Sequence, residues 1–171
     1  MSQYICVDIG GTSIKHGVLD ENAIIKECNQ TKTEAWLGGA AVLDKVKTIG
    51  KQYKEQYENI EGICISTAGM VDPEEGKIVF AGELMPGYTG TCIKKELEKA
   101  LEMPCEVEND VNCAGLAEYV SGSAKESHIM FCATVGTGIG GCAIVNGRVF
   151  HGASNSACEV GYIPMGDSDF Q

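Results

Sequence analysis

The chain has 171 residues, a formal net charge of −11, 44% apolar residues and 22% charged residues. These values are typical of a soluble globular protein that has one well-buried core, or one small domain and part of another. The net negative charge and the lack of a cluster of basic residues argue against a nucleic-acid partner, because binding to a phosphate backbone normally requires a stripe of Lys and Arg. ATP is compatible with this charge, since Mg²⁺ and backbone N–H groups can carry the phosphate charge.

The first residues, MSQYICVDIGG, lack the basic segment and long apolar core of a signal peptide. No stretch approaches the ~18 consecutive apolar residues of a membrane helix. We therefore expect a cytoplasmic protein with no membrane partner. The nine cysteines are odd in number and contain no C-x-x-C pair, which favours buried reduced thiols over a disulfide or metal framework.

The first half of the chain begins with three predicted strands joined by tight turns, over residues 4–9, 14–19 and 23–28. Residues 37–57 carry apolar side chains at a 3.6-residue spacing, which predicts an amphipathic helix. The later predicted elements are, in order, a buried strand over 60–69, a turn at DPEEGK, a helix over 91–101 with Thr91 as N-cap, a strand at CEVEND and a helix over 111–120.

The chain also contains an internal similarity. If the sequence is aligned with itself so that Cys6 is paired with Cys132, then Gly10 is paired with Gly136. The same alignment pairs the polar break at 20–22 with Asn146–Gly147. Both copies follow the order strand, glycine turn, strand, polar turn, strand. A duplication would give two similar lobes, each with one glycine turn; the alternative is a chance match between two meanders.

Two glycine-rich turns are candidates for phosphate binding. In DIGGT, residues 8–12, consecutive N–H groups can converge on an anion, and Asp8 at a strand end can hold a hydrated Mg²⁺ ion. The segment VGTGIGGC, residues 135–142, lacks the lysine of a P-loop but can hold phosphate by its backbone alone. The alternative for each segment is a hairpin turn without a ligand.

Two further segments carry candidate catalytic and sugar-binding carboxylates. In EVENDVN, the dipole of the following helix would keep Asp110 ionised, so that Asp110 could accept a hydroxyl proton in phosphoryl transfer. The alternative is that Asn109 or Asp110 only caps the helix. In HGASNSACEVGYIPM, Glu159 can accept hydrogen bonds from paired sugar hydroxyls, or it belongs to a salt bridge or a solvated loop.

In their order and spacing, the segments DIGGT, ISTAGMVD, MPGY, VENDVN, VGTGIGG and ASNSACEVGY resemble the ROK family of repressors, open reading frames and kinases. Its kinases are sugar kinases of the actin–hexokinase superfamily. The resemblance covers essentially the whole chain. It implies an α/β, ribonuclease H-like small lobe over residues 1–120 and the start of a larger, similar lobe over residues 121–171.

The resemblance also implies roles for the matching residues. Asp110 would be the catalytic base on the 6-hydroxyl of a hexose-type sugar, and the γ-phosphoryl group would come from Mg-ATP. The sugar would bind Asn109, Gly69 and Glu159. The first phosphate turn would comprise Asp8, Gly10, Gly11 and Thr12, with Asp8 holding Mg²⁺ through water. The second would comprise Gly136, Thr137, Gly138, Gly140 and Gly141.

The chain departs from the family pattern at several positions. Tyr162 replaces a histidine that usually contacts the sugar and ligates a structural zinc ion, and no cysteine-rich segment follows, so we expect no zinc site in this chain. Leu84 and Met85 stand where an asparagine often precedes the Pro-Gly-aromatic segment, which indicates a different sugar selectivity. Cys158 stands where glycine is usual.

Family members are longer than this chain, so the adenine-binding side would lie outside it. We therefore expect the 171-residue chain alone to be inactive, and any homodimer to form through the missing C-terminal lobe. Two alternatives to a kinase stay open: a non-catalytic sugar-binding sensor, and a repressor of the same family without its DNA-binding domain.

Overall fold

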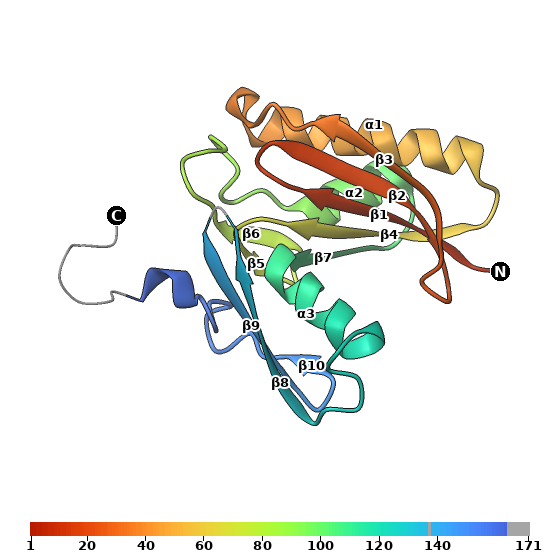
Figure 1. Cartoon of the computed structure of the whole chain (residues 1–171). Coiled ribbons are helices and arrows are strands. Elements are labelled where there is room, and N and C mark those ends of the chain that lie inside the picture. Colours follow the sequence, from red (N-terminus) through yellow and green to blue (C-terminus); the bar gives the residue numbers. More distant parts are fainter. Residues whose placement is uncertain (137, 164–171) are drawn as a thin grey trace. The chain divides into compact units, whose positions relative to one another are not determined.

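The computed structural model describes residues 1–136 and 138–163 (Figure 1). The chain divides into two compact units, Met1–Asp110 and Val111–Gln171. The boundary near residue 120 that the family resemblance implies concerns the complete kinase fold and stays a prediction.

The first unit is built on a five-stranded sheet with the strand order β3-β2-β1-β4-β7. The first three strands form an antiparallel meander, and β4 and β7 run parallel to β1. The meander predicted from the sequence is confirmed, as are the two later strands. The bounds are β1 (Gln3–Ile9), β2 (Ser13–Asp20), β3 (Ile25–Lys32), β4 (Ile60–Thr67) and β7 (Cys105–Asn109).

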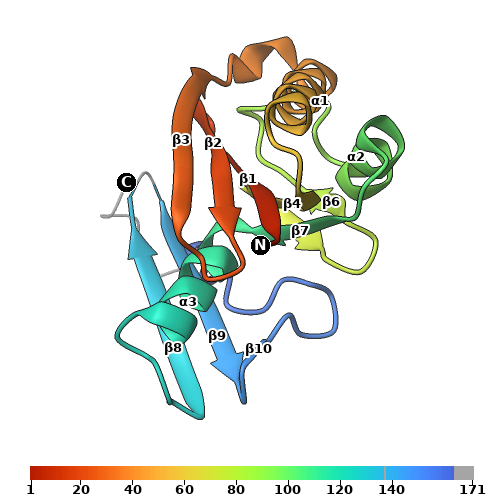
Figure 2. The ribbon, with the colours of Figure 1, turned by 90° about the vertical axis from the view of Figure 1, so that its right-hand side faces the viewer.

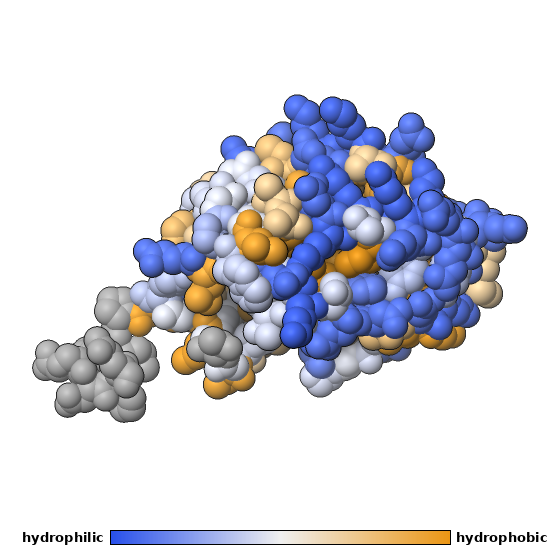
Figure 3. All heavy atoms as spheres, turned by 90° about the horizontal axis from the view of Figure 1, so that it is seen from above, coloured by the Kyte–Doolittle hydropathy of each residue, from blue (hydrophilic) through white to orange (hydrophobic). Residues whose placement is uncertain are grey.

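Two helices, α1 (Gly39–Gln56) and α2 (Ile93–Leu101), cover the same face of this sheet (Figure 2). Their buried side chains recur every three or four residues, so each helix turns one apolar stripe toward the strands. The outward side of α1 carries exposed charged residues, and Figure 3, which looks down on that side, shows a mostly hydrophilic surface. A short 3₁₀ turn, η1 (Ala35–Leu37), precedes α1.

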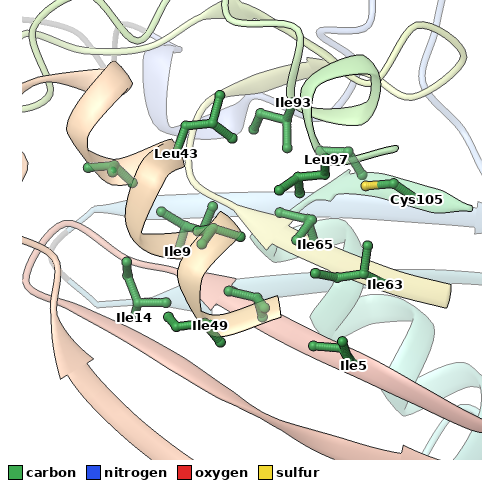
Figure 4. Packing of buried hydrophobic residues seen from close by; sticks show 14 of the residues in the cluster. Ile5, Ile9, Ile14, Leu43, Ile49, Ile63, Ile65, Ile93, Leu97 and Cys105 are labelled. Carbon is green, nitrogen blue, oxygen red and sulfur yellow. The ribbon is translucent and has the colours of Figure 1, made fainter. Parts of the chain in front are cut away.

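The core of the first unit lies between the helices and one face of the sheet (Figure 4). Alternate residues of β1 and β4 point into it because successive strand side chains face opposite sides. Full burial of one such aliphatic side chain contributes about 1.5–3 kcal/mol, so this face contributes much of the apolar stabilisation of the unit. Side chains shown in Figure 4 include Ile5, Ile9, Ile63, Ile65, Ile93 and Leu97.

A small hairpin between β4 and α2 was not predicted. It consists of β5 (Met70–Asp72) and β6 (Lys77–Phe80) and surrounds the predicted DPEEGK turn. The prediction of Thr91 as N-cap of α2 is wrong: the helix starts at Ile93, and its N-cap residue is Cys92. The N–H of Thr91 instead donates to the carbonyl oxygen of Tyr88 and closes a turn, and the carbonyl oxygen of Thr91 accepts a bond from the N–H of Ile78, so this part of the chain is tied to β6.

The second unit contains α3 (Asp110–Ser121), which begins at the last residue of the first unit, and a three-stranded antiparallel sheet of order β10-β9-β8. The predicted repeat of the meander is confirmed, although its third strand has only two residues. The bounds are β8 (Ile129–Val135), β9 (Ile139–Val145), β10 (Arg148–Val149) and a 3₁₀ turn, η2 (Val160–Tyr162).

The prediction that the cysteines are buried is wrong for most of them. All nine are reduced thiols in the part of the chain that the structure describes, but only Cys105 and Cys142 are buried, while Cys28 and Cys64 are exposed. The reason is the face on which they lie. Cys6 and Cys64 alternate with core residues of β1 and β4, Cys28 lies in the same cross-strand row, and all three point away from α1 and α2. Among the described residues, no helix is long and apolar enough to cross a membrane.

Candidate active site

The predicted site residues of the first unit meet at one edge of its sheet. Because β1, β4 and β7 are parallel, their carboxyl ends lie side by side, and Ile9, Thr67 and Asn109 occupy one row across the three strands. Ligands of open α/β sheets bind at this edge, outside the carboxyl ends of the strands. The glycine turn continues from β1, Gly69 follows β4, and Asp110 follows β7.

The turn between β1 and β2 is closed by backbone bonds. The N–H of Gly10 donates to the carbonyl oxygen of Ser13 at 3.1 Å, and a Cβ atom at Gly10 would lie only 3.0 Å from that oxygen. A Cβ atom at Gly11 would meet no atom within 4 Å, and the φ of Gly11 lies outside the left-handed range. The fold therefore requires no glycine at position 11, which leaves open space on an exposed turn for the approach of a ligand.

Thr33, which sequence reasoning missed, fixes this turn from the neighbouring β3–η1 connection. It is fully buried; its hydroxyl donates to the carbonyl oxygen of Gly10 at 2.6 Å, and its N–H donates to that of Thr12 at 3.0 Å. The ammonium group of Lys45 in turn donates to the carbonyl oxygen of Thr33 at 3.0 Å. No sequence signal identified Thr33, because its partners lie far from it along the chain and become neighbours only through the β2–β3 pairing.

Asp8 is the second-last residue of β1 and lies on the sheet face opposite the helices. Its carboxylate accepts a 2.7 Å hydrogen bond from the hydroxyl of Ser66, its row neighbour on β4. On the neighbouring strand β2, which lies on the side of β1 opposite β4, the exposed Lys15 is paired with Asp8 in the strand register. Ser66 was also missed from the sequence, since it reads as an ordinary residue in a strand.

Asn109 connects the ends of two strands. Its side-chain amide donates to the carbonyl oxygen of Gly69 at 2.9 Å and to the carboxylate of Asp110 at 3.1 Å. Gly69 has a φ of 100°, and a Cβ atom there would lie 2.7 Å from the carbonyl oxygen of Phe80, so both the backbone and the packing require glycine. The structure thus brings together the three residues Gly69, Asn109 and Asp110 that sequence reasoning assigned to sugar and catalysis.

The MPGY segment is anchored beside the same edge. The hydroxyl of Tyr88 shares a 2.7 Å hydrogen bond with that of Thr67, the last residue of β4. Burial raises the pKa of Tyr88 to about 12, so this phenol stays protonated at every physiological pH. The carbonyl oxygen of Pro86 accepts a 2.9 Å bond from the N–H of Gly39 at the start of α1. These contacts fix the segment on both sides.

The second glycine turn lies in the second unit, between β8 and β9. The N–H of Gly136 donates to the carbonyl oxygen of Gly138 at 2.9 Å, and Thr137 lies outside the described residues. Gly140 and Gly141 lie inside β9, not in the turn. Added Cβ atoms there would lie 2.5 Å from the side chain of Val111 and 2.5 Å from the carbonyl oxygen of Cys158, respectively, so both glycines have packing reasons of their own.

Glu159, the predicted sugar ligand of this unit, is half-buried and precedes η2. The residue before it, Cys158, has a φ of 66°. This left-handed conformation costs a residue with a Cβ roughly 1–2 kcal/mol and explains why glycine would be preferred at that position.

The donor set of the first unit suits Mg²⁺ better than a transition metal. Mg²⁺ keeps several waters and is commonly held by one or two carboxylates together with phosphate oxygens, and Asp8 offers one carboxylate beside an open turn. Within residues 1–136 and 138–163, no three His, Cys, Asp or Glu side chains form a cluster that could hold a metal by themselves.

The fold and this edge define a ribonuclease H-like α/β domain with an open glycine turn and an aspartate at the ends of parallel strands. The chain belongs to the ROK family, whose family model matches residues 4–170. The resemblance seen in the sequence and the expected fold class are both confirmed.

Three comparisons illustrate this relation. The chain is 51% identical to an uncharacterized protein of Clostridium perfringens, over 100% of this chain and 58% of that protein. It is 33% identical to a beta-glucoside kinase of Listeria monocytogenes, over 91% of this chain and 51% of that protein. A ROK family glucokinase from Streptomyces griseus, solved in complex with glucose and AMPPNP, matches with a TM-score of 0.83 at 30% identity, over 95% of this chain and 50% of that one. The chain thus spans about half the length of the relatives it matches.

Proposed function

We propose that the chain is the N-terminal part of an ATP-dependent sugar kinase that transfers the γ-phosphoryl group to the 6-hydroxyl of a hexose-type sugar. The observation that carries this proposal is the meeting of Asp8, the Gly10–Thr12 turn, Asn109 and Asp110 at the carboxyl edge of one sheet. The family, the beta-glucoside kinase relative and the nucleotide-bound glucokinase structure support it.

In this proposal, different residues of the chain have separate roles in phosphoryl transfer. The Asp110 carboxylate accepts the proton of the attacking hydroxyl, and Asn109, which bonds to that carboxylate, orients it and binds the sugar beside it. The N–H of Gly10 closes the turn, the N–H groups of Gly11 and Thr12 face the phosphates, and Thr33 fixes the position of the turn. Bound Mg²⁺, held through water by Asp8, would neutralise charge on the phosphates. In this chemistry positioning counts for more than basicity, because the phosphoryl group is transferred through a loose transition state.

The residues of the second unit have proposed roles in the same reaction. Thr137 and Gly138 would offer the second set of phosphate-binding N–H groups, in the turn that the N–H of Gly136 closes, and Glu159 would accept hydrogen bonds from sugar hydroxyls. Gly140 and Gly141 would act mainly by allowing β9 to pack closely against its neighbours.

An ADP-release assay of the full reading frame tests the proposal. A panel of glucose, fructose, allose, N-acetylmannosamine and a β-glucoside would be offered with Mg-ATP to the wild type, to Asp110→Asn and to Asp44→Asn. Asp44 is an exposed aspartate of α1 and serves as the matched control. We expect sugar-dependent ADP release that falls about 100-fold or more in Asp110→Asn and is unchanged in Asp44→Asn.

The alternative readings predict other results. Saturable sugar binding by calorimetry without ADP release from any sugar would favour the non-catalytic sensor or the repressor over the kinase. Unchanged turnover in Asp110→Asn would refute the assignment of the base.

A further inference from the structure

One row of residues crosses the face of the first sheet that points away from α1 and α2. In the strand register Cys28 pairs with Gly17, Gly17 with Cys6, Cys6 with Cys64, and Cys64 with Glu106. Residues paired in this way share one face of a sheet. Gly17 offers no side chain, so Cys28 is separated from the other thiols, whereas Cys6 and Cys64 are immediate neighbours.

The positions of Cys6 and Cys64 suit a covalent link between them. Adjacent strands lie about 4.8 Å apart, and disulfides join cysteines whose Cα atoms are about 4.4–6.8 Å apart. The two thiols are already joined by a side-chain hydrogen bond. Cys64 is exposed and Cys6 is partly exposed, so a small solute can reach the pair.

The surroundings of Cys64 also favour its reactive form. The hydrogen bond from Cys6 lowers the pKa of Cys64 to about 7, against the opposing effects of its partial burial and of the Glu106 carboxylate on the next strand. That carboxylate is held by the ammonium group of Lys94 at 3.2 Å. A lowered pKa favours the thiolate, which is the nucleophile.

We propose that Cys6 and Cys64 form a dithiol site that reacts with hydroperoxides and closes to an intrachain disulfide. The Cys64 thiolate attacks the outer oxygen of the peroxide, the O–O bond breaks, and the alkoxide or hydroxide that leaves takes up a proton. This step oxidises Cys64 to a sulfenic acid and reduces the peroxide to an alcohol or water. The Cys6 sulfur then displaces the sulfenic hydroxyl, its proton leaves with that group as water, and the S–S bond forms.

The site is separate from the proposed kinase chemistry. The next row on the same face holds Asp8 and Ser66, two residues farther along each strand, and neither takes part in the thiol reaction. The inference depends on the strand register, the contact between the two thiols and their exposure, and none of these involves the kinase reaction, so it holds or fails independently of the proposed function.

The experiment uses the unmodified chain and needs no activity assay. The protein would be treated with a small molar excess of hydrogen peroxide, its remaining thiols blocked, and its peptides mapped by mass spectrometry without reduction. We expect one intrachain link between the Cys6 and Cys64 peptides. The second cross-strand pair, Cys132 and Cys142, is the internal comparison; it should react at least about tenfold more slowly because Cys142 is fully buried.

Two variants test the separate steps. In Cys6→Ser, the sulfenic acid at Cys64 should accumulate and be trapped by dimedone, because no second thiol resolves it. In Cys28→Ser, an exposed cysteine of the same row is removed, and the link should form as in the wild type.

Phenylarsine oxide, which bridges two adjacent thiols, gives a readout on the wild type that does not depend on any variant's folding. One equivalent should protect Cys6 and Cys64 together from alkylation. The proposal is overturned if peroxide leaves Cys64 reduced, if Cys64 becomes linked to a cysteine of another chain, if Cys132 and Cys142 are linked first, or if the arsenical protects neither residue.

Discussion

Replacement of Thr33 by valine removes one hydroxyl and keeps the shape of a fully buried side chain. The hydroxyl donates to the carbonyl oxygen of Gly10 at 2.6 Å, so the variant leaves that oxygen without this donor. A hydrogen bond contributes about 0.5–1.5 kcal/mol net, and an unsatisfied buried partner costs about 1–3 kcal/mol. Gly10 is only half-buried, so water can partly replace the donor. We therefore expect a loss of about 1–2 kcal/mol in the free energy of unfolding.

Urea and thermal unfolding followed by circular dichroism would measure this loss. For a chain of 171 residues, 1 kcal/mol corresponds to a decrease of about 2–4 °C in melting temperature. The bond from the Thr33 N–H to Thr12 remains, so the turn should loosen without unfolding. Hydrogen exchange should therefore quicken over residues 10–14 more than over α2.

The matched control is Thr48→Val. Thr48 lies on α1, and its hydroxyl donates to the carbonyl oxygen of Asp44 at 2.9 Å in an exposed position. Its replacement should change the stability by less than about 0.5 kcal/mol. Equal effects of the two substitutions, or faster exchange everywhere except in the turn, would refute the role of Thr33 in holding the turn.

Three further changes test the core, the ion pair between the buried Asp20 and the exposed Lys26, and the sheet. Leu97→Ala should destabilise the protein by about 2–5 kcal/mol in urea unfolding because Leu97 is fully buried (Figure 4); Leu84→Ala, at an 81% exposed position, should change stability by less than about 0.5 kcal/mol, and equal losses would contradict the packing. The hydrogen bond from Lys26, together with two backbone N–H groups, holds the pKa of Asp20 below its usual range. This carboxylate therefore stabilises the fold above its unfolded pKa of about 4, and the contribution is lost as the pH falls through the lower folded pKa. The stability difference between the wild type and Asp20→Asn, followed by unfolding at a series of pH values, should shrink below about pH 4; a constant difference down to pH 2 would count against it. Gly17→Ala places a methyl group against a carbonyl oxygen of β3, so the midpoint of urea unfolding should fall by an amount equivalent to about 1–3 kcal/mol, and an unchanged midpoint would show that β3 can move aside.

Local sequence patterns were enough to place most strands and helices. The apolar spacing over residues 37–57 predicted α1, which spans Gly39–Gln56, and the alternation over residues 4–19 predicted β1 and β2. The repeat was also visible, because the two copies share the order of apolar segments and turn residues. These features involve residues within a few positions of one another, where side-chain periodicity alone decides which face is buried.

The same local reasoning failed where distant segments compete for a residue. Threonine is a residue type that often caps helices, but the backbone of Thr91 bonds to Ile78 and Tyr88, and the helix starts at Ile93. Cysteines in apolar strands were expected to be buried, yet Cys64 faces away from the helices that cover the other side of its strand. The alternation of a strand shows which residues share a face, but it does not show whether another element will cover the second face.

The family, the fold class and the residue types of the candidate site could be predicted from the amino-acid sequence, because glycine turns and strand-end carboxylates are local features. The residues that hold those groups in place became evident from the folded structure alone. The contacts of Thr33 with Gly10, Ser66 with Asp8, and Asn109 with Gly69 join positions 23, 58 and 40 residues apart. They exist because the strand order β3-β2-β1-β4-β7 places the carboxyl ends of β1, β4 and β7 side by side, and that order is set by burial over the whole unit.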